Sequence, residues 1–147
     1  MIITQGRRTE KVNSSYRCGD IVFCESVGNG DHIQNGKRYH VVVSNNIGNR
    51  YSPVLVAIPL TTKIKKENMV THTIFEAGTG GLPKRSMLLA EQATTISKSD
   101  ICFRLGSLQD RDLDKLAVAL VFSLPIVWRA FETGIANSKE FQRVASS

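Results

Sequence analysis

Two apolar runs lie in the stretch YHVVVSNNIGNRYSPVLVAIPL, residues 39–60, and they decide the class of fold. Residues 39–44 and residues 54–60 each have the length and the β-branched composition of a strand that is buried on at least one face. Residues 45–49 are rich in asparagine and include a glycine, which predicts a turn. The stretch therefore predicts two successive strands with no helical crossover between them.

The same pattern continues on both sides of this stretch. Gly19 introduces a predicted strand at residues 20–24, and a loop rich in Gly, Asn and Asp follows over residues 28–36. Further strands are predicted at residues 71–75, 86–90 and 101–105. Closely spaced strands without helices between them are typical of a small antiparallel barrel or sandwich.

The periodicity changes at Gln109. Apolar side chains then recur every three or four residues, at Leu113, Leu116, Ala117, Leu120, Val121 and Leu124. Asp110 and Asp112 suit the positive end of the helix dipole in the first turn. The pattern predicts an amphipathic helix that packs on the barrel and ends or kinks at Pro125.

Beyond Pro125, the side chains of Trp128, Phe131 and Ile135 share one helical face. This spacing predicts a second, shorter helix followed by a polar tail, so that residues 125–147 form a helical extension. Strands followed by packed helices place the protein in the α+β class, and a length of 147 residues fits one domain. Residues 1–16 are polar and lack periodicity, which predicts a leader outside that domain.

Composition limits the function classes. No apolar run approaches the ~20 residues that span a bilayer, and residues 1–17 lack the apolar core of a secretory signal. The three cysteines, Cys18, Cys24 and Cys102, show no metal-ligand spacing. We therefore expect a reduced, cytoplasmic protein without a metal ion or cofactor. The net charge of +6 favours a polyanionic partner, either a nucleic acid or an acidic inhibitor.

Polar residues that suit phosphate chemistry stand near the ends of predicted strands. Gln34, Lys37 and Arg38 close the glycine-rich loop, and the Arg38 guanidinium offers planar, permanently charged donors that match a phosphate bidentately. Thr61 follows an apolar strand directly, so its hydroxyl can donate to a phosphate oxygen. A solvated loop arginine and a polar turn are the alternative interpretations of these two sites.

Two further segments carry side chains that can bind a polynucleotide. Thr62, Lys63 and Lys65 follow Thr61 and offer an electrostatic track for a polynucleotide. Glu91 and Gln92 follow the strand at residues 86–90, and the Gln92 amide can read a base edge or a 2′-hydroxyl. A cap or a ladder-end hydrogen bond would explain Gln92 equally well.

The histidines are candidates for proton transfer because imidazole titrates near neutral pH. His40 lies on the same side of its predicted strand as Arg38, so it is a candidate proton shuttle, or else a packed core histidine. His32, in the glycine-rich loop, is a second candidate. The sequence contains no nucleophile elbow and no Walker, Rossmann or zinc-finger motif.

Short motifs in a fixed order resemble the MazF/PemK toxin family over residues 17–124. The chain matches that family at Gly19–Phe23, Gln34–Arg38, Val41–Asn45, Asn49–Pro53, Pro59–Lys63, Thr71–His72, Gly81–Pro83, Ser86 and Glu91–Lys98. The amphipathic helix over residues 110–124 matches the family's C-terminal helix. A series of matches in order is far more specific than any one of them.

The resemblance implies a small SH3-like β-barrel with a packed helix, usually in a homodimer. It implies metal-independent cleavage of single-stranded RNA at short sequences, which leaves a 2′,3′-cyclic phosphate. The catalytic arginine and threonine of the family correspond to Arg38 and Thr61. The implied partner is an antitoxin whose acidic, flexible tail covers the RNA groove.

The chain departs from the family pattern at three positions. Ile33 stands where the family has glutamate, Tyr39 where it has proline, and Thr94 where it has arginine. Tyr39 can stack on a base or pack against the barrel. Two other functions therefore stay open: a toxin or adaptor of the CcdB kind that binds a protein without catalysis, and a barrel that binds nucleic acid without cutting it.

Overall fold

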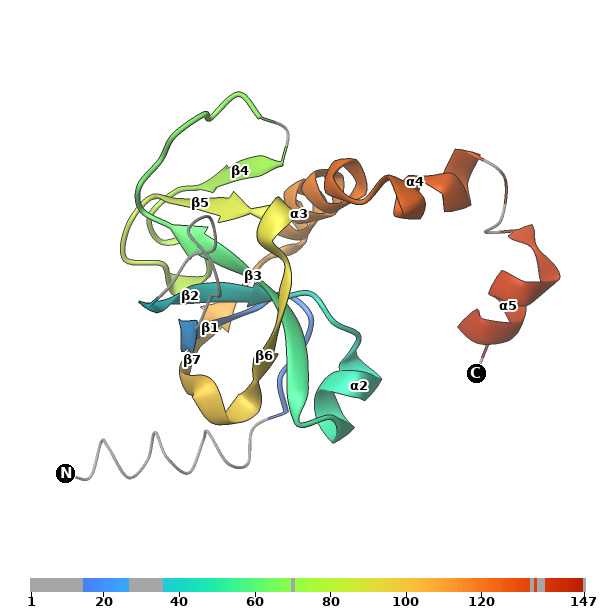
Figure 1. Ribbon diagram of the computed structural model, residues 1–147, viewed down its shortest axis with the longest axis horizontal. Coiled ribbons are helices and arrows are strands. Elements are labelled where there is room, and N and C mark those ends of the chain that lie inside the picture. Colours follow the sequence, from blue (N-terminus) through green and yellow to red (C-terminus); the bar gives the residue numbers. More distant parts are fainter. Residues whose placement is uncertain (1–14, 27–35, 70, 133, 135–136, 147) are drawn as a thin grey trace.

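The computed structural model describes residues 15–26, 36–69, 71–132, 134 and 137–146 (Figure 1). The strands of this described chain are β1 (Asp20–Ser26), β2 (Gly36–Val42), β3 (Val54–Thr61), β4 (His72–Phe75), β5 (Ser86–Leu89), β6 (Thr94–Ser97) and β7 (Ile101–Ser107). The helices are α2 (Asn46–Tyr51), α3 (Asp110–Ser123), α4 (Pro125–Glu132) and α5 (Lys139–Ala145). Short 3₁₀ turns occur at η1 (Thr79–Gly81), η2 (Ala90–Gln92) and η3 (Lys98–Asp100).

The strands form one antiparallel sheet in the order β4-β5-β3-β2-β1-β7, and β6 pairs with the first half of β3. The predicted α+β fold with an antiparallel sheet is confirmed. The sheet is barrel-like but not closed, because no pairing joins β4 to β7 within the described residues. The turn η1 packs on β7 instead, so closely that a Cβ on Gly106 would overlap the carbonyl oxygen of Gly80.

Two clusters of buried side chains lie on the two faces of the sheet. Ile21 and Val41 belong to one cluster, while their neighbours Val22 and Val42 belong to the other. Successive side chains of a strand point to opposite faces, so the curved sheet is packed on both sides. This explains why the strands read as continuous apolar runs rather than as an alternation of apolar and polar residues.

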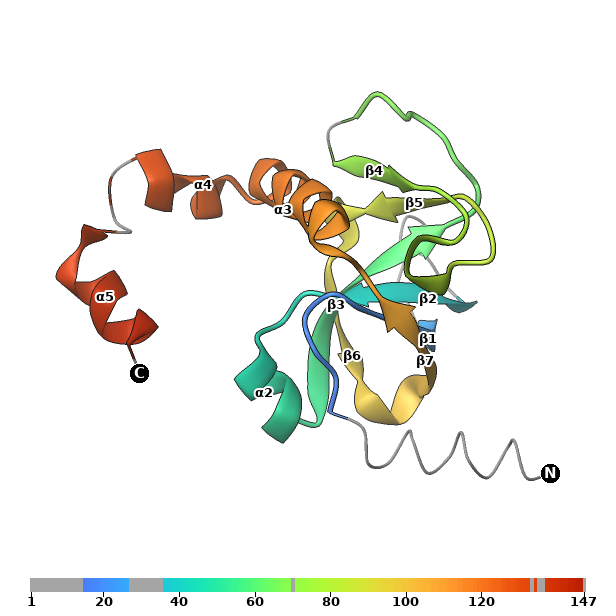
Figure 2. The same ribbon diagram turned by 180° about the vertical axis from the view of Figure 1, so that it is seen from behind.

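The predicted amphipathic helix is confirmed as α3, which covers the first cluster (Figures 1 and 2). Leu116 and Ala119 are its buried apolar residues. Two members of the predicted face, Ala117 and Leu124, are exposed instead, because only a narrow stripe of the helix contacts the sheet. The chain turns at Leu124, and Pro125 is the first residue of α4, where a missing N–H does no harm.

The asparagine-rich segment after β2 is a helix, not the turn that the sequence predicts. Asn45 caps α2, because its side-chain oxygen accepts a hydrogen bond of 2.7 Å from the Gly48 N–H. Asn49 is fully buried, and its side chain donates to the carbonyl of Ser44 at 2.8 Å and accepts from the Ser44 hydroxyl. The asparagines thus cap and anchor a short helix between β2 and β3.

Asp20 connects the chain before β1 to β7 through hydrogen bonds. Its carboxylate is buried and accepts hydrogen bonds from the Ser107 hydroxyl at 2.6 Å and the Arg17 N–H at 2.9 Å. Gly19 before it has a φ of 92°, and a Cβ there would lie 2.9 Å from a methyl group of Leu113. The Gly-Asp pair is therefore explained by packing. Tyr16, in the segment predicted as a leader, is only 2% exposed and packs in the second cluster.

Helices α4 and α5 extend away from the sheet as an arm (Figure 1). The predicted second helix is confirmed as α4, which contains Trp128 and Phe131, and Ile135 lies outside the described residues. Helix α5 stands where the sequence predicts a polar tail. Ser138 caps α5, since its hydroxyl accepts a hydrogen bond from the Phe141 N–H at 3.1 Å. Within the described residues, every helix is too short or too polar to cross a membrane.

Candidate RNA-binding and catalytic site

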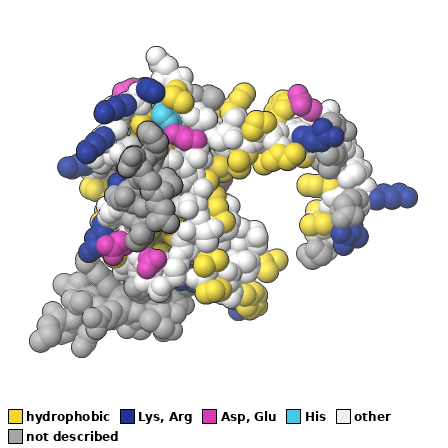
Figure 3. All heavy atoms as spheres, in the orientation of Figure 1, with side chains coloured by type: hydrophobic (Ala, Val, Ile, Leu, Met, Phe, Trp, Pro, Cys, Tyr) yellow, Lys and Arg dark blue, Asp and Glu magenta, His cyan; other side chains and the backbone are white. Residues whose placement is uncertain are grey.

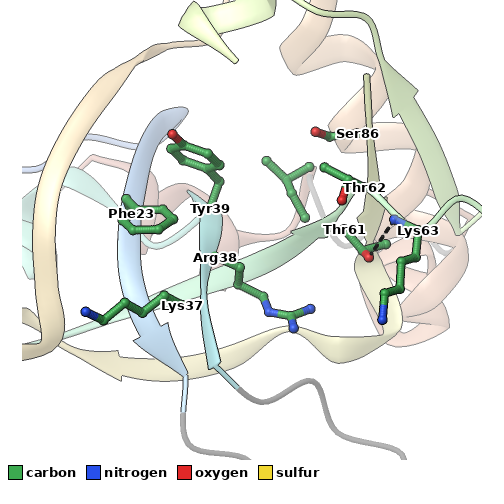
Figure 4. Close-up of a pocket in the computed structure, with 9 residues that line it drawn as sticks. Phe23, Lys37, Arg38, Tyr39, Thr61, Thr62, Lys63 and Ser86 are labelled. Atoms are coloured by element: carbon green, nitrogen blue, oxygen red, sulfur yellow. Dashed lines mark hydrogen bonds between the residues drawn. The ribbon is translucent and has the colours of Figure 1, made fainter. Parts of the chain in front are cut away.

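A pocket of about 260 Å³ opens where β2 and the end of β3 lie side by side (Figure 4). It is lined by Phe23, Lys37, Arg38, Tyr39, Leu60, Thr61, Thr62, Lys63 and Ser86. Each strand therefore delivers a block of consecutive residues from the predicted site. Three cations and several hydroxyl groups around one hollow can bind an anionic ligand such as a phosphodiester.

Arg38 is held at its base by the sheet. It faces Cys24 in the β1–β2 pairing, and its side chain is half-buried. Burial lowers the pKa of the Arg38 guanidinium from its ordinary value, but an arginine stays charged at neutral pH. In Figure 4 the guanidinium extends toward the side of the pocket where Thr61 and Lys63 lie, whereas Lys37 extends away from it. The arrangement places a fixed positive charge across from a hydroxyl.

Thr61 is the last residue of β3, paired with Met87 of β5. Its Oγ1 accepts a hydrogen bond of 3.1 Å from the Lys63 N–H (Figure 4). Because the hydroxyl accepts from the protein, its own proton remains available to be donated to a ligand oxygen. The turn after β3 thus orients Thr61 as a donor and brings Lys63 to the pocket rim.

Aromatic rings form one side of the site. The Phe23 ring lies 4.8 Å from Tyr39 and 5.2 Å from Phe103, centroid to centroid. Phe23 and Tyr39 line the pocket, and Phe103 supports them from β7. A supported ring at a pocket edge can stack on a base.

The structure brings together six of the residues predicted from sequence: Lys37, Arg38, Tyr39, Thr61, Thr62 and Lys63. Lys65, Glu91 and Gln92 do not line this pocket. Lys65 is exposed in the loop after β3, and Gln92 is half-buried with an Oε1 that has no hydrogen-bond partner among the described residues. Gln34 and His32 lie outside the described residues.

Sequence reasoning missed Phe23, Leu60 and Ser86 as pocket residues. Phe23 and Leu60 belong to apolar runs and look like ordinary core residues. Ser86 is buried, and its hydroxyl donates to the Lys84 carbonyl at 2.9 Å. The pairing of β1 with β2 places Phe23 opposite Tyr39, and this register is not readable from the apolar run itself.

His40 is fully buried and does not line the pocket. Its Nδ1 lies 3.2 Å from the Arg38 carbonyl oxygen and 3.1 Å from the Cys24 sulfur. Burial, helped by the nearby Arg38 charge, lowers the pKa of His40 to about 4, and burial raises the pKa of the Cys24 thiol to about 12. At neutral pH both side chains are therefore uncharged.

No three His, Cys, Asp or Glu side chains in the described ranges lie close enough together to hold a metal ion. The groups available at the pocket are donors of hydrogen bonds and positive charge. Such groups can bind a phosphodiester and stabilise negative charge that develops on it.

Known proteins similar to this chain point to one family. A family model described as the PemK-like, MazF-like toxin of type II toxin–antitoxin systems matches residues 17–124. The endoribonuclease EndoA of Bacillus subtilis strain 168 is 33% identical over 109 residues, which cover 74% of this chain and 94% of EndoA.

Two solved structures share the fold. The crystal structure of MazF from Deinococcus radiodurans has a TM-score of 0.66 at 19% identity and covers 77% of this chain and 99% of its own. A mycobacterial endoribonuclease in complex with its cognate antitoxin has a TM-score of 0.59 at 22% identity and covers 76% and 95%. From the family model and the identity to EndoA, the chain belongs to the PemK-like, MazF-like toxins of type II toxin–antitoxin systems.

Proposed function

We propose that the protein is an endoribonuclease toxin that cleaves single-stranded RNA, with Arg38 and Thr61 as its catalytic residues. The observation that carries the proposal is their position: two neighbouring strands deliver a fixed guanidinium and an oriented hydroxyl to one pocket. The activity named for EndoA, which is 33% identical, supports the same reaction class. Binding without cleavage would not require this pair.

The proposed reaction uses the RNA as its own nucleophile. The 2′-oxygen forms a bond to phosphorus, the bond from phosphorus to the 5′-oxygen breaks, and a 2′,3′-cyclic phosphate remains. One proton leaves the 2′-hydroxyl and another reaches the departing 5′-oxygen. Arg38 and Thr61 stabilise the additional negative charge of the phosphorane, and no metal ion takes part. An arginine is a poor base, so its role is charge stabilisation.

The surrounding residues bind the substrate. Lys37 and Lys63 hold neighbouring phosphates, Thr62 donates to the backbone, and Tyr39 stacks on a base. Lys65, Glu91 and Gln92 contact RNA beyond the pocket, and Gln34 is included among the RNA-binding residues from the sequence alone. No step is assigned to His40, because it is buried away from the pocket.

The proposed partners are a second copy of this chain and an antitoxin with an acidic, flexible tail. The net charge of +6 and the cationic pocket rim suit such a tail. The mycobacterial relative that was solved with its cognate antitoxin supports this type of complex. Exposed apolar side chains on α3 and α4, among them Phe122, Trp128 and Phe131, support the homodimer. We also propose a cytoplasmic location, where cellular RNA is present.

Incubation of a long single-stranded RNA with the protein in EDTA tests the activity. We expect the wild type to cut, and Arg38→Ala and Thr61→Val to cut at least ~100-fold more slowly, as removal of a preorganised donor does. Arg50→Ala is the matched control, because Arg50 lies exposed on α2. An intact RNA with the wild type, or equal rates for Arg38→Ala, would contradict the proposal.

The ends of the products test the chemistry separately. We expect the upstream fragment to end in a cyclic phosphate that an enzyme specific for such rings opens. Fragments that resist this enzyme would show that the 2′-hydroxyl is not the nucleophile. RNA that binds without being cut would favour a nucleic-acid-binding barrel.

A further inference from the structure

His72, the first residue of β4, connects two segments that are far apart in sequence. Its Nε2 lies 2.7 Å from Oε1 of Glu91 in η2, and its Nδ1 lies 3.3 Å from the carbonyl oxygen of Lys66. The His72 side chain is 8% exposed and that of Glu91 is 41% exposed. The contact is therefore largely shielded on the histidine side.

The two contacts fix the orientation of the imidazole. One ring nitrogen faces the Glu91 carboxylate and the other faces the Lys66 carbonyl oxygen, so the ring spans the gap between η2 and the chain before β4. Carboxylate and carbonyl oxygens both accept hydrogen bonds. His72 thus connects Glu91 to the Lys66 backbone.

The Lys66 backbone shows what this pair holds in place. Lys66 has a φ of 53°, in the left-handed region that side-chain-bearing residues seldom adopt. Its carbonyl oxygen also accepts a hydrogen bond from the Met69 backbone N–H at 3.1 Å. The backbone N–H of His72 donates to the Met69 carbonyl oxygen at 2.9 Å. The turn at residues 66–69 is thus closed by hydrogen bonds that converge on His72.

This turn belongs to the basic loop after β3. Lys63 of the same loop lines the pocket, and Lys65 stands exposed beside it. Glu67 anchors the far side of the loop through an ion pair of 3.4 Å with Arg85. Lys and Arg side chains gather over the segment between β3 and β4 in Figure 3. Because Lys63 and Lys65 directly precede the turn at residues 66–69, the position of this turn affects where their side chains point.

We propose that His72 is a positioning residue of the RNA site: its imidazole ring joins Lys66 to Glu91 and thereby holds the basic loop toward the pocket. The proposal rests on the function proposed above, since it names the residue that presents Lys63 and Lys65 to the RNA backbone. His72 itself does not line the pocket and touches no reacting atom.

Amide hydrogen exchange followed by NMR tests the contacts without any need for activity. The Met69 N–H donates to the Lys66 carbonyl oxygen, so its exchange reports whether the turn is held. In the full-length Arg38→Ala protein we expect an added His72→Gln substitution to speed exchange at Met69. Unchanged exchange at Met69 in a folded His72→Gln protein would overturn the proposal.

Cleavage kinetics test the positioning role. We expect His72→Gln to raise KM by roughly tenfold, to leave kcat within about twofold, and to reduce the salt dependence of binding by about one phosphate contact. Asp114→Asn is the control, because Asp114 lies exposed on α3 and does not line the pocket. Thermal unfolding is measured for both variants.

The outcomes separate the two proposals. A fall in kcat with KM unchanged, or unaltered kinetics in a folded His72→Gln protein, would overturn the positioning role. A wild type that cuts no RNA would contradict the proposed function alone. In that case RNA affinity and the NMR spectra still decide whether His72 holds the loop.

Discussion

The two histidines that the structure describes differ in the groups that surround their rings. His72 lies at the start of a strand, where a carboxylate and a carbonyl oxygen meet its ring. His40 lies in the middle of β2, fully buried beside a neutral thiol. The sequence places both in strands, yet only the packing of neighbouring strands determines that one is paired with a charge and the other is enclosed. His40 therefore influences the pH dependence of folding rather than that of the pocket.

The His40 side chain should destabilise the fold in mild acid. Its pKa is about 4 in the folded chain and 6.5 in the unfolded one, so between these values only the unfolded chain binds the proton. The free energy of unfolding should fall by about 2–3 kcal/mol as the pH drops from 6.5 to 4. His40→Gln should lack this part of the decline. Urea unfolding at several pH values measures it, and parallel curves for the two proteins would contradict it.

Among the elements, the strands with valine- and leucine-rich runs were predictable and the short polar elements were not. Residues 20–22 and 57–60 are buried on both faces, so their apolar composition identifies these strands, although Val54 and Val56 at the start of β3 are exposed. β6 has four residues and only Ile96 is buried, which leaves no periodic signal. α2 was mistaken for a turn because asparagines serve as readily for helix caps as for turns.

The site residues that lie near strand ends were predictable from the sequence. The residues whose place depends on the direction of a strand were not. Arg38 and Thr61 lie on the neighbouring antiparallel strands β2 and β3. In the sequence, only the ordered series of family motifs indicates that they belong to one site. Ser86 starts β5 at the pocket, whereas Glu91 comes after the opposite end of that strand. Glu91 therefore lies one strand length away from the pocket residue Ser86. The sequence does not show which end of β5 lies at the pocket.

Removal of the Asn45 cap should loosen α2. Asn45→Ala deletes the hydrogen bond to the Gly48 N–H, which should lower the free energy of unfolding by about 1 kcal/mol. Asn45→Asp is the matched control, because its carboxylate keeps the acceptor. Urea denaturation compares the three proteins. Equal stabilities for the alanine and aspartate variants would show that the cap contributes nothing.

For the whole molecule, the unusual feature is the amount of exposed apolar surface. Large apolar side chains on α3, α4 and α5, and on Leu124 between α3 and α4, are 42–74% exposed: Val118, Phe122, Leu124, Ile126, Val127, Trp128, Phe131, Phe141 and Val144. Val121, Phe122, Pro125 and Trp128 also enclose a hollow of about 230 Å³. Apolar side chains gather along the arm in Figure 3. Contiguous apolar surface of this kind marks an interface, which supports the proposed homodimer.

The single tryptophan makes this interface measurable. Trp128 is 47% exposed in one chain, so dimerisation through the arm should bury it and shift its fluorescence emission to shorter wavelength as concentration rises. Phe131→Glu should remove both the shift and the dimer in sedimentation experiments. Lys84→Glu adds the same side chain at an exposed position outside the hollow and should change neither. A dimer that persists in Phe131→Glu would place the contact elsewhere.

The pairing of β1 with β2 runs from Ile21–Val41 to Ser26–Gly36 without a break in register. Arg38 and Tyr39 are therefore fixed by strand pairing, whatever the length of the chain between Ser26 and Gly36. Lengthening a loop costs little free energy once its ends are held. That connection can consequently differ in length between relatives, or be lengthened in the laboratory, without moving Arg38 or Tyr39.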